Sequence, residues 1–140
     1  SVPLPGSGQW LSGSYDRKSR QLCVTFYDQG QGIPRTLPTS KFFEKIKTFW
    51  FDSWSDAEKI EAAMQIGRSS TGKSERGKGL QNFVMFAQVH ESGILSIYSG
   101  KGMYRMTWSS GGKPEQTEKR NLDHSIGGTL IEWSVQLAKK

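Results

Sequence analysis

The chain has little of what marks an exported or membrane-embedded protein. It carries one cysteine, Cys23, which rules out an internal disulfide bond and a multi-cysteine metal site. No apolar run approaches the roughly 20 residues that a membrane-spanning helix needs, and no charged-then-apolar leader follows Ser1. These absences predict a protein of the reducing cytoplasm that has no membrane partner.

An initiator methionine is also missing, and the chain opens on Ser1-Val-Pro-Leu-Pro-Gly6. This opening suggests a fragment of a longer protein. A length of 140 residues fits one domain. We therefore expect residues 1–140 to form a single, truncated domain, with other domains of the longer chain as candidate partners.

Acidic residues are in the minority, because 13 Asp and Glu stand against 19 Lys and Arg, for a net charge of +6. Basic residues gather within residues 17–20 and again within residues 73–78. Such clusters attract the phosphates of nucleotides or nucleic acids. The second cluster lies among glycines, which favours a nucleotide. A basic nucleic-acid-binding module is the less favoured alternative, supported only by charge and five tryptophans.

The period-two pattern and its flanking turns predict five strands, at residues 10–15, 22–27, 94–98, 103–108 and 129–136. Polar or glycine-containing turns join the first two strands and the next two, which predicts two hairpins. Residues 109–127 are rich in glycine and charge and predict a loop.

Apolar residues at helical spacing predict three helices, at residues 42–50, 55–66 and 77–89. Ser55 and Glu58 read as a capping box at the start of the second helix. Strands, then helices, then strands predict an α+β fold. We expect a two-layer sandwich in which helices cover one face of a mixed sheet.

One glycine-rich segment, Gly67–Ser74, matches the phosphate-loop pattern G-x-x-x-x-G-K-[ST]. In a phosphate loop the backbone N–H groups wrap a phosphate between a buried strand and a following helix. Here the preceding residues 55–66 predict a capped helix. The two glycines in Glu75-Arg-Gly-Lys-Gly79 make a helix directly after Ser74 unfavourable. The phosphate loop is therefore a less favoured interpretation.

A second set of glycine motifs joins distant parts of the chain. Asp28-x-Gly30-x-Gly32 follows a predicted strand, and its glycines let a ligand approach the backbone closely. Residues 76–80 open an amphipathic helix, whose free N–H groups attract an anion. Gly128-Thr129 begins the last strand. Each motif alone is weak evidence for a nucleotide site, but the three motifs in this order are specific evidence.

These motifs resemble those of the gyrase, Hsp90, histidine-kinase and MutL ATPase superfamily. Residues 28–34 look like its first glycine box, and residues 70–80 are similar to its second glycine box with the end of the ATP lid. Residues 93–99 and 128–131 look like strands that close its sandwich. The resemblance covers residues 10–137 and implies the C-terminal portion of a histidine-kinase-like (Bergerat-type) ATP-binding fold without its first helix.

The resemblance implies ATP as the ligand. Asp28 would accept a hydrogen bond from the adenine 6-amino group, supported by Thr129, while Gly30 and Gly32 leave room beside the base. The phosphates would be held by residues of the glycine-rich stretch, namely Thr71, Lys73, Arg76, Gly77, Lys78, Gly79 and Leu80.

The helix that holds magnesium in this superfamily has no counterpart in the sequence. The magnesium-binding Asn of the family lies on a helix before the first glycine box, often with a Glu that serves as base. Glycines and prolines between Ser1 and Asp28 exclude such a helix. We therefore predict no catalytic or metal-binding residue in this chain, and expect Mg²⁺ only if an upstream helix exists in the full-length protein. An ATPase or a kinase stays open, and a non-catalytic regulatory domain with weak or lost nucleotide binding is the main alternative.

Overall fold

The computed structural model describes residues 2–3, 8–36, 53–69, 92–109 and 113–137. The predicted helices at residues 42–50 and 77–89 lie outside these ranges. In chain order the described elements are β1 (Val2–Pro3), β2 (Gln9–Asp16), β3 (Gln21–Asp28), α1 (Ile33–Thr36), α3 (Asp56–Ser69), β4 (Ser92–Ser99), β5 (Gly102–Ser109), β6 (Lys113–Asn121) and β7 (Thr129–Gln136).

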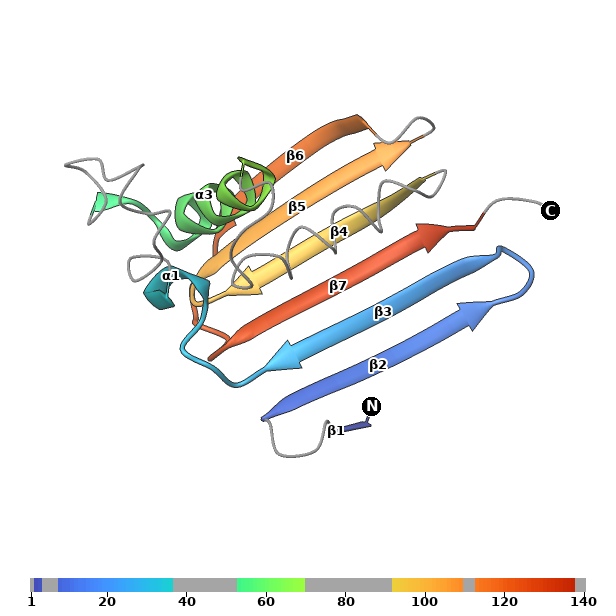
Figure 1. Cartoon of the computed structure of the whole chain (residues 1–140), viewed down its shortest axis with the longest axis horizontal. Coiled ribbons are helices and arrows are strands. Elements are labelled where there is room, and N and C mark those ends of the chain that lie inside the picture. The colour runs from blue at the N-terminus through green and yellow to red at the C-terminus, as the bar shows by residue number, and fades with distance from the viewer. Residues whose placement is uncertain (1, 4–7, 37–52, 70–91, 110–112, 138–140) are drawn as a thin grey trace.

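The strands form one sheet in the order β1-β2-β3-β7-β4-β5-β6 (Figure 1). Helix α3 lies over β5 and β6, and α1 lies beside the end of the sheet where β3 stops and β7 starts. The prediction of an α+β fold is confirmed. The prediction of a mixed sheet is wrong for the described strands, because every one of their pairings is antiparallel.

Both predicted hairpins are confirmed, as β2–β3 and β4–β5. In the first hairpin the Lys18 backbone N–H donates to Asp16 Oδ1 over 2.8 Å. This hydrogen bond, with weaker ones from Ser19, lowers the pKa of Asp16. The second hairpin turns through Gly100, whose φ of 59° lies in the left-handed region that glycine adopts at low cost.

Strand β6 corrects the predicted loop at residues 109–127. It pairs with β5 along the edge of the sheet, and its side chains from Gln116 to Asn121 are exposed or half-buried. A strand with no strongly buried face has no need of alternating apolar residues. The hydrophobic pattern that identified β2, β3, β4, β5 and β7 was therefore absent here.

The core lies on the face of the sheet that α3 covers. A row of neighbouring side chains crosses four strands there, formed by Phe26, Ile131, Ile97 and Tyr104. The same hydrophobic cluster includes two residues of α3, the fully buried Ile60 and Met64.

Trp108 is the largest fully buried side chain. It lies opposite Gly93, where an added Cβ would come within 2.5 Å of the indole ring. The glycine therefore makes room for the tryptophan.

Helix α3 begins with the predicted capping box. The Ser55 N–H donates to Glu58 Oε2 over 2.7 Å, and the Glu58 N–H donates to Ser55 Oγ over 3.3 Å. Next along the chain, Asp56 Oδ2 accepts the Lys101 backbone N–H over 2.8 Å and so fixes the helix start on the β4–β5 turn. The helix extends to Ser69, beyond its predicted end.

On the exposed side of α3, Lys119 Nζ donates to Glu61 Oε2 over 2.6 Å, which raises the pKa of Lys119. Such exposed ion pairs contribute little to stability. No helix in the described part of the chain is long and apolar enough to cross a membrane.

Replacing Ile60 by Ala should lower the free energy of unfolding by about 2–5 kcal/mol, because the buried side chain leaves a cavity between α3 and the sheet. Urea unfolding followed by circular dichroism measures this change. The matched control is Ile94→Ala, at a side chain that is 42% exposed, where a much smaller loss is expected. Equal losses at both positions would contradict the assigned core.

Candidate functional site

Asp28 and Thr129 meet at one end of the sheet. Asp28 is the last residue of β3, Thr129 is the first of β7, and the two are direct partners in the antiparallel register. Alternation along β3 places Asp28 on the same face as Phe26, the face that α3 covers. Thr129 is buried and Asp28 is half-buried. Two residues predicted to share a site are therefore neighbours.

The Asp28 carboxylate accepts one hydrogen bond from the described residues. Its Oδ1 accepts the Gly30 backbone N–H over 2.8 Å, which closes the turn after β3. Within the described ranges, this N–H is the only hydrogen-bond donor to the carboxylate. The other oxygen, Oδ2, thus accepts no hydrogen bond from the residues that the structure describes.

Glycine at this end of the sheet permits very close backbone packing. Gly128 has a φ of 110°, and an added Cβ would lie 2.0 Å from the Asp28 carbonyl oxygen. Gly32 has a φ of 85°, and a Cβ there would lie 3.0 Å from Ser99 Oγ. The space beside Gly32 is thus taken by Ser99, so this glycine serves the packing of the loop against β4 and β7.

Ser99 connects three segments at this end and was missed by the sequence analysis. Its fully buried Oγ accepts the Ile33 N–H over 2.8 Å and lies 2.9 Å from Thr129 Oγ1. It also donates to the Gly128 carbonyl over 3.2 Å. The sequence offered little sign of this role, because Ser99 begins a glycine-containing turn and was interpreted only as part of a hairpin.

The predicted phosphate-binding residues, from Thr71 to Leu80, lie outside the described residues. Residues 67–69 are the last turn of α3, so a helix and not a buried strand runs directly into the phosphate-loop match. The structural requirement of a phosphate loop is therefore not met on that side.

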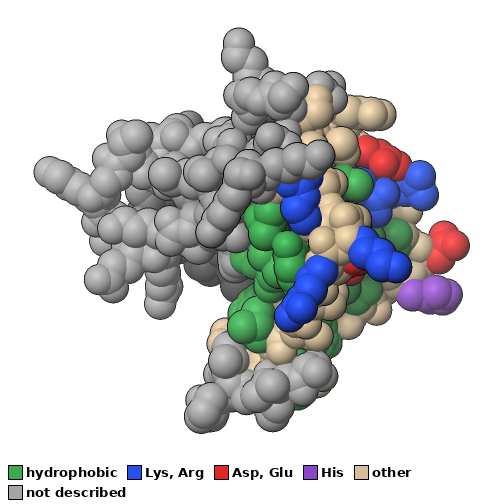
Figure 2. Space-filling view, turned by 90° about the vertical axis from the view of Figure 1, so that its right-hand side faces the viewer, with side chains coloured by type: hydrophobic (Ala, Val, Ile, Leu, Met, Phe, Trp, Pro, Cys, Tyr) green, Lys and Arg blue, Asp and Glu red, His purple; other side chains and the backbone are tan. Residues whose placement is uncertain are grey.

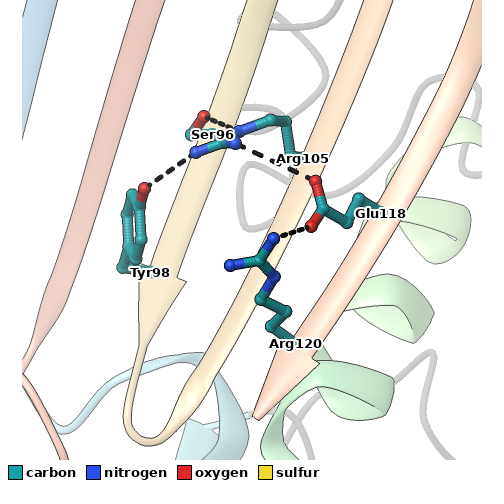
Figure 3. Close-up of polar contacts among 5 residues, drawn as sticks. All are labelled: Ser96, Tyr98, Arg105, Glu118 and Arg120. Atoms are coloured by element: carbon teal, nitrogen blue, oxygen red, sulfur yellow. Dashed lines mark hydrogen bonds and ion pairs between the residues drawn. The ribbon is translucent and has the colours of Figure 1, made fainter. Parts of the chain in front are cut away.

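A second polar cluster lies on the opposite face of the sheet (Figure 3). Arg105 of β5 donates through Nε to Ser96 Oγ over 3.0 Å and through a terminal nitrogen to the Tyr98 hydroxyl over 3.2 Å. Glu118 pairs with Arg120 at 2.7 Å and lies 3.9 Å from Arg105. The two arginines are thus held by protein groups, which weakens the case for a nucleic-acid-binding surface at this place.

The described residues contain no group of three or more His, Cys, Asp or Glu side chains that could hold a metal ion. A scan against models of known protein families gives no match, and a search of curated proteins gives none either. The arrangement of Asp28, Thr129 and Ser99 is therefore interpreted from its own chemistry.

Gly128→Ala should disrupt the meeting point of β3 and β7. The added methyl group would collide with the Asp28 carbonyl, so we expect a loss of about 2 kcal/mol or more in the free energy of unfolding. Gly127→Ala is the matched control, because its φ of 64° is also left-handed but nothing lies within 4 Å of the added Cβ. Its loss should stay near 1 kcal/mol, about the cost of the backbone conformation alone. A larger loss at Gly127 than at Gly128 would contradict the close approach.

Proposed function

We propose that the chain binds ATP as the C-terminal portion of a histidine-kinase-like ATP-binding domain, with Asp28 recognising adenine. The observation that supports this is the register pairing of Asp28 with Thr129 beside the glycine turn. The resemblance of the sequence motifs to the ATPase superfamily requires this pair to be close, although the two residues lie far apart along the chain.

The chemistry of Asp28 fits an adenine. A half-buried carboxylate oxygen to which no described residue donates gains from a ligand that supplies a donor, since an unpaired charge is costly away from water. The adenine 6-amino group is such a donor. Guanine carries a carbonyl oxygen at the same ring position, which would face the carboxylate with a repulsive lone pair. The site should therefore prefer ATP to GTP.

Thr129 would support the base from the adjoining strand. Its hydroxyl is held 2.9 Å from Ser99 Oγ, so its position is fixed before any ligand arrives. Residues 71–80 would hold the phosphates, a role that rests on the sequence resemblance alone. Mg²⁺, which supplies charge neutralisation of the phosphates when bound, would need ligands from an upstream helix.

A non-catalytic regulatory domain of the same fold is the second candidate. In the described residues before Asp28, the elements are strands β1, β2 and β3. None of them is a helix of the kind that holds the metal in the superfamily. This arrangement favours a regulatory domain that binds nucleotide weakly or not at all.

Replacing Asp28 by Asn should weaken ATP binding about ten- to a hundredfold, because a hydrogen bond to a charged acceptor is worth roughly 1.5–3 kcal/mol. Asn keeps an oxygen that accepts the Gly30 N–H, so the turn should survive. Calorimetric titration of ATP and GTP into the chain measures both affinity and base preference.

Asp16→Asn is the matched control. Asp16 also ends a strand and accepts a backbone N–H over 2.8 Å, but it lies at the opposite end of the β2–β3 hairpin. It should leave ATP affinity unchanged. Equal affinity for ATP and GTP, or normal ATP binding by Asp28→Asn, would remove Asp28 from the site.

A further inference from the structure

Three polar side chains form a row across the end of the sheet where the proposed base site lies. Asp28 of β3 pairs with Thr129 of β7, and Thr129 pairs on its other side with Ser99 of β4. Side chains of direct cross-strand partners share one face of a sheet. Exposure rises along this row, because Ser99 is fully buried, Thr129 is 6% exposed and Asp28 is half-buried. Asp28 is therefore the open end of the row, and Ser99 is its buried end.

The Ser99 hydroxyl has three partners, and their chemistry decides where its proton lies. The Ile33 N–H, at 2.8 Å, can only donate, and the Gly128 carbonyl oxygen, at 3.2 Å, can only accept. A serine hydroxyl has one proton, so Ser99 donates it to Gly128. The third contact, 2.9 Å to Thr129 Oγ1, is then a hydrogen bond only if Thr129 is the donor.

The reverse arrangement of the two protons is unfavourable in this place. If Ser99 donated to Thr129, a lone pair of Ser99 would face the Gly128 carbonyl oxygen at 3.2 Å. Two acceptors in contact repel one another. Ser99 and Gly128 are both buried, so water does not relieve such a contact.

Thr129 therefore has only lone pairs to offer to a ligand. Its one proton is used on Ser99, and in the described part of the chain its hydroxyl makes no other hydrogen bond. The neighbouring Asp28 carboxylate accepts as well: Oδ1 takes the Gly30 N–H, and no described residue donates to the other oxygen. A group that contacts both side chains must bring its own hydrogens.

We infer that Ser99 is a positioning residue that sets base specificity, because it takes the Thr129 proton and so makes Thr129 an acceptor beside Asp28. The inference rests on the proposed function, since it places the base at Asp28. Cross-strand partners hold their Cβ atoms about 4.5–5.5 Å apart, so one exocyclic group can contact both side chains. Two adjacent acceptors select a base that presents an amino group, as adenine does. They reject a base that presents a carbonyl oxygen, because its lone pairs would meet theirs.

The test is the ratio of the dissociation constants of ITP and ATP, measured by calorimetric titration. ITP has a carbonyl oxygen in place of the 6-amino group and lacks the 2-amino group of GTP. Both nucleotides carry the same phosphates, so surface Lys and Arg side chains such as those in Figure 2 attract them equally. In Ser99→Ala the Thr129 hydroxyl is free to turn and donate to the ITP carbonyl. The ratio should then fall about fivefold, which is the effect of one neutral hydrogen bond.

Further variants separate this role from a structural one. Thr129→Ser keeps the hydroxyl and should keep the ratio of the unaltered chain. Thr129→Val removes the hydroxyl and leaves the other two hydrogen bonds of Ser99 in place. In that background Ser99→Ala should no longer change the ratio. Ser96→Ala is the matched control, because Ser96 is also a buried, hydrogen-bonded serine of β4 but lies on the opposite face of the sheet. It should leave the ratio unchanged.

The position of the protons can be tested without a ligand. NMR of the isotope-labelled chain detects hydroxyl protons that exchange slowly with water. The Thr129 hydroxyl proton should be protected from exchange and should show a nuclear Overhauser effect to the Ser99 β-protons. It should lose this protection in Ser99→Ala, because its acceptor is gone.

The outcomes distinguish the inference from the proposed function. A Ser99 proton directed at Thr129, or an unchanged ratio in Ser99→Ala, overturns the inference while ATP binding leaves the proposed function standing. An equal change of the ratio in Ser96→Ala, or in Ser99→Ala combined with Thr129→Val, also overturns it, because Ser99 would then act only through the fold. A chain that binds neither nucleotide, with the protons placed as expected, overturns the proposed function, and the selection of the base falls with it.

Discussion

The fold depends on one row of apolar side chains that crosses the middle of the sheet. Phe26, Ile131, Ile97 and Tyr104 are successive cross-strand neighbours on the face of the sheet where α3 packs. Because side chains alternate between the two faces of a strand, a slip of one residue would turn this row away from the core. The row therefore fixes the pairing register of the strands. In that register, the pair two residues beyond Phe26 and Ile131 is Asp28 and Thr129.

The candidate site is thus a product of core packing rather than of local sequence. Ser99 then adds a second restraint, because its buried hydroxyl ties the start of α1 to the start of β7. A ligand-binding group held by a rigid scaffold needs little reorganisation on binding. The glycines contribute by letting backbones touch where a side chain would keep them apart, as at Gly128.

The sequence predicted the features of the fold that depend on neighbouring residues. Alternation and turn residues located five strands, and Ser55 with Glu58 located the start of α3. It missed the two-residue β1 and also β6, since an edge strand without a strongly buried face carries no alternating signal. It also missed Ser99, whose partners lie on other strands. Pairing across long sequence separations leaves no trace in the local pattern, so Asp28 and Thr129 were joined only through a family resemblance.

The order of strands has a consequence for how the protein acquires its structure. β7 follows all the other described strands in sequence but lies between β3 and β4, near the middle of the sheet. During synthesis, the hairpin β2–β3 and the meander β4–β6 can form as separate units, each with an uncovered inner edge. They join only after β7 has been synthesised, and such long-range closure is slow. Loss of the last dozen residues would therefore leave two unpaired half-sheets prone to aggregation, rather than a domain with a frayed end.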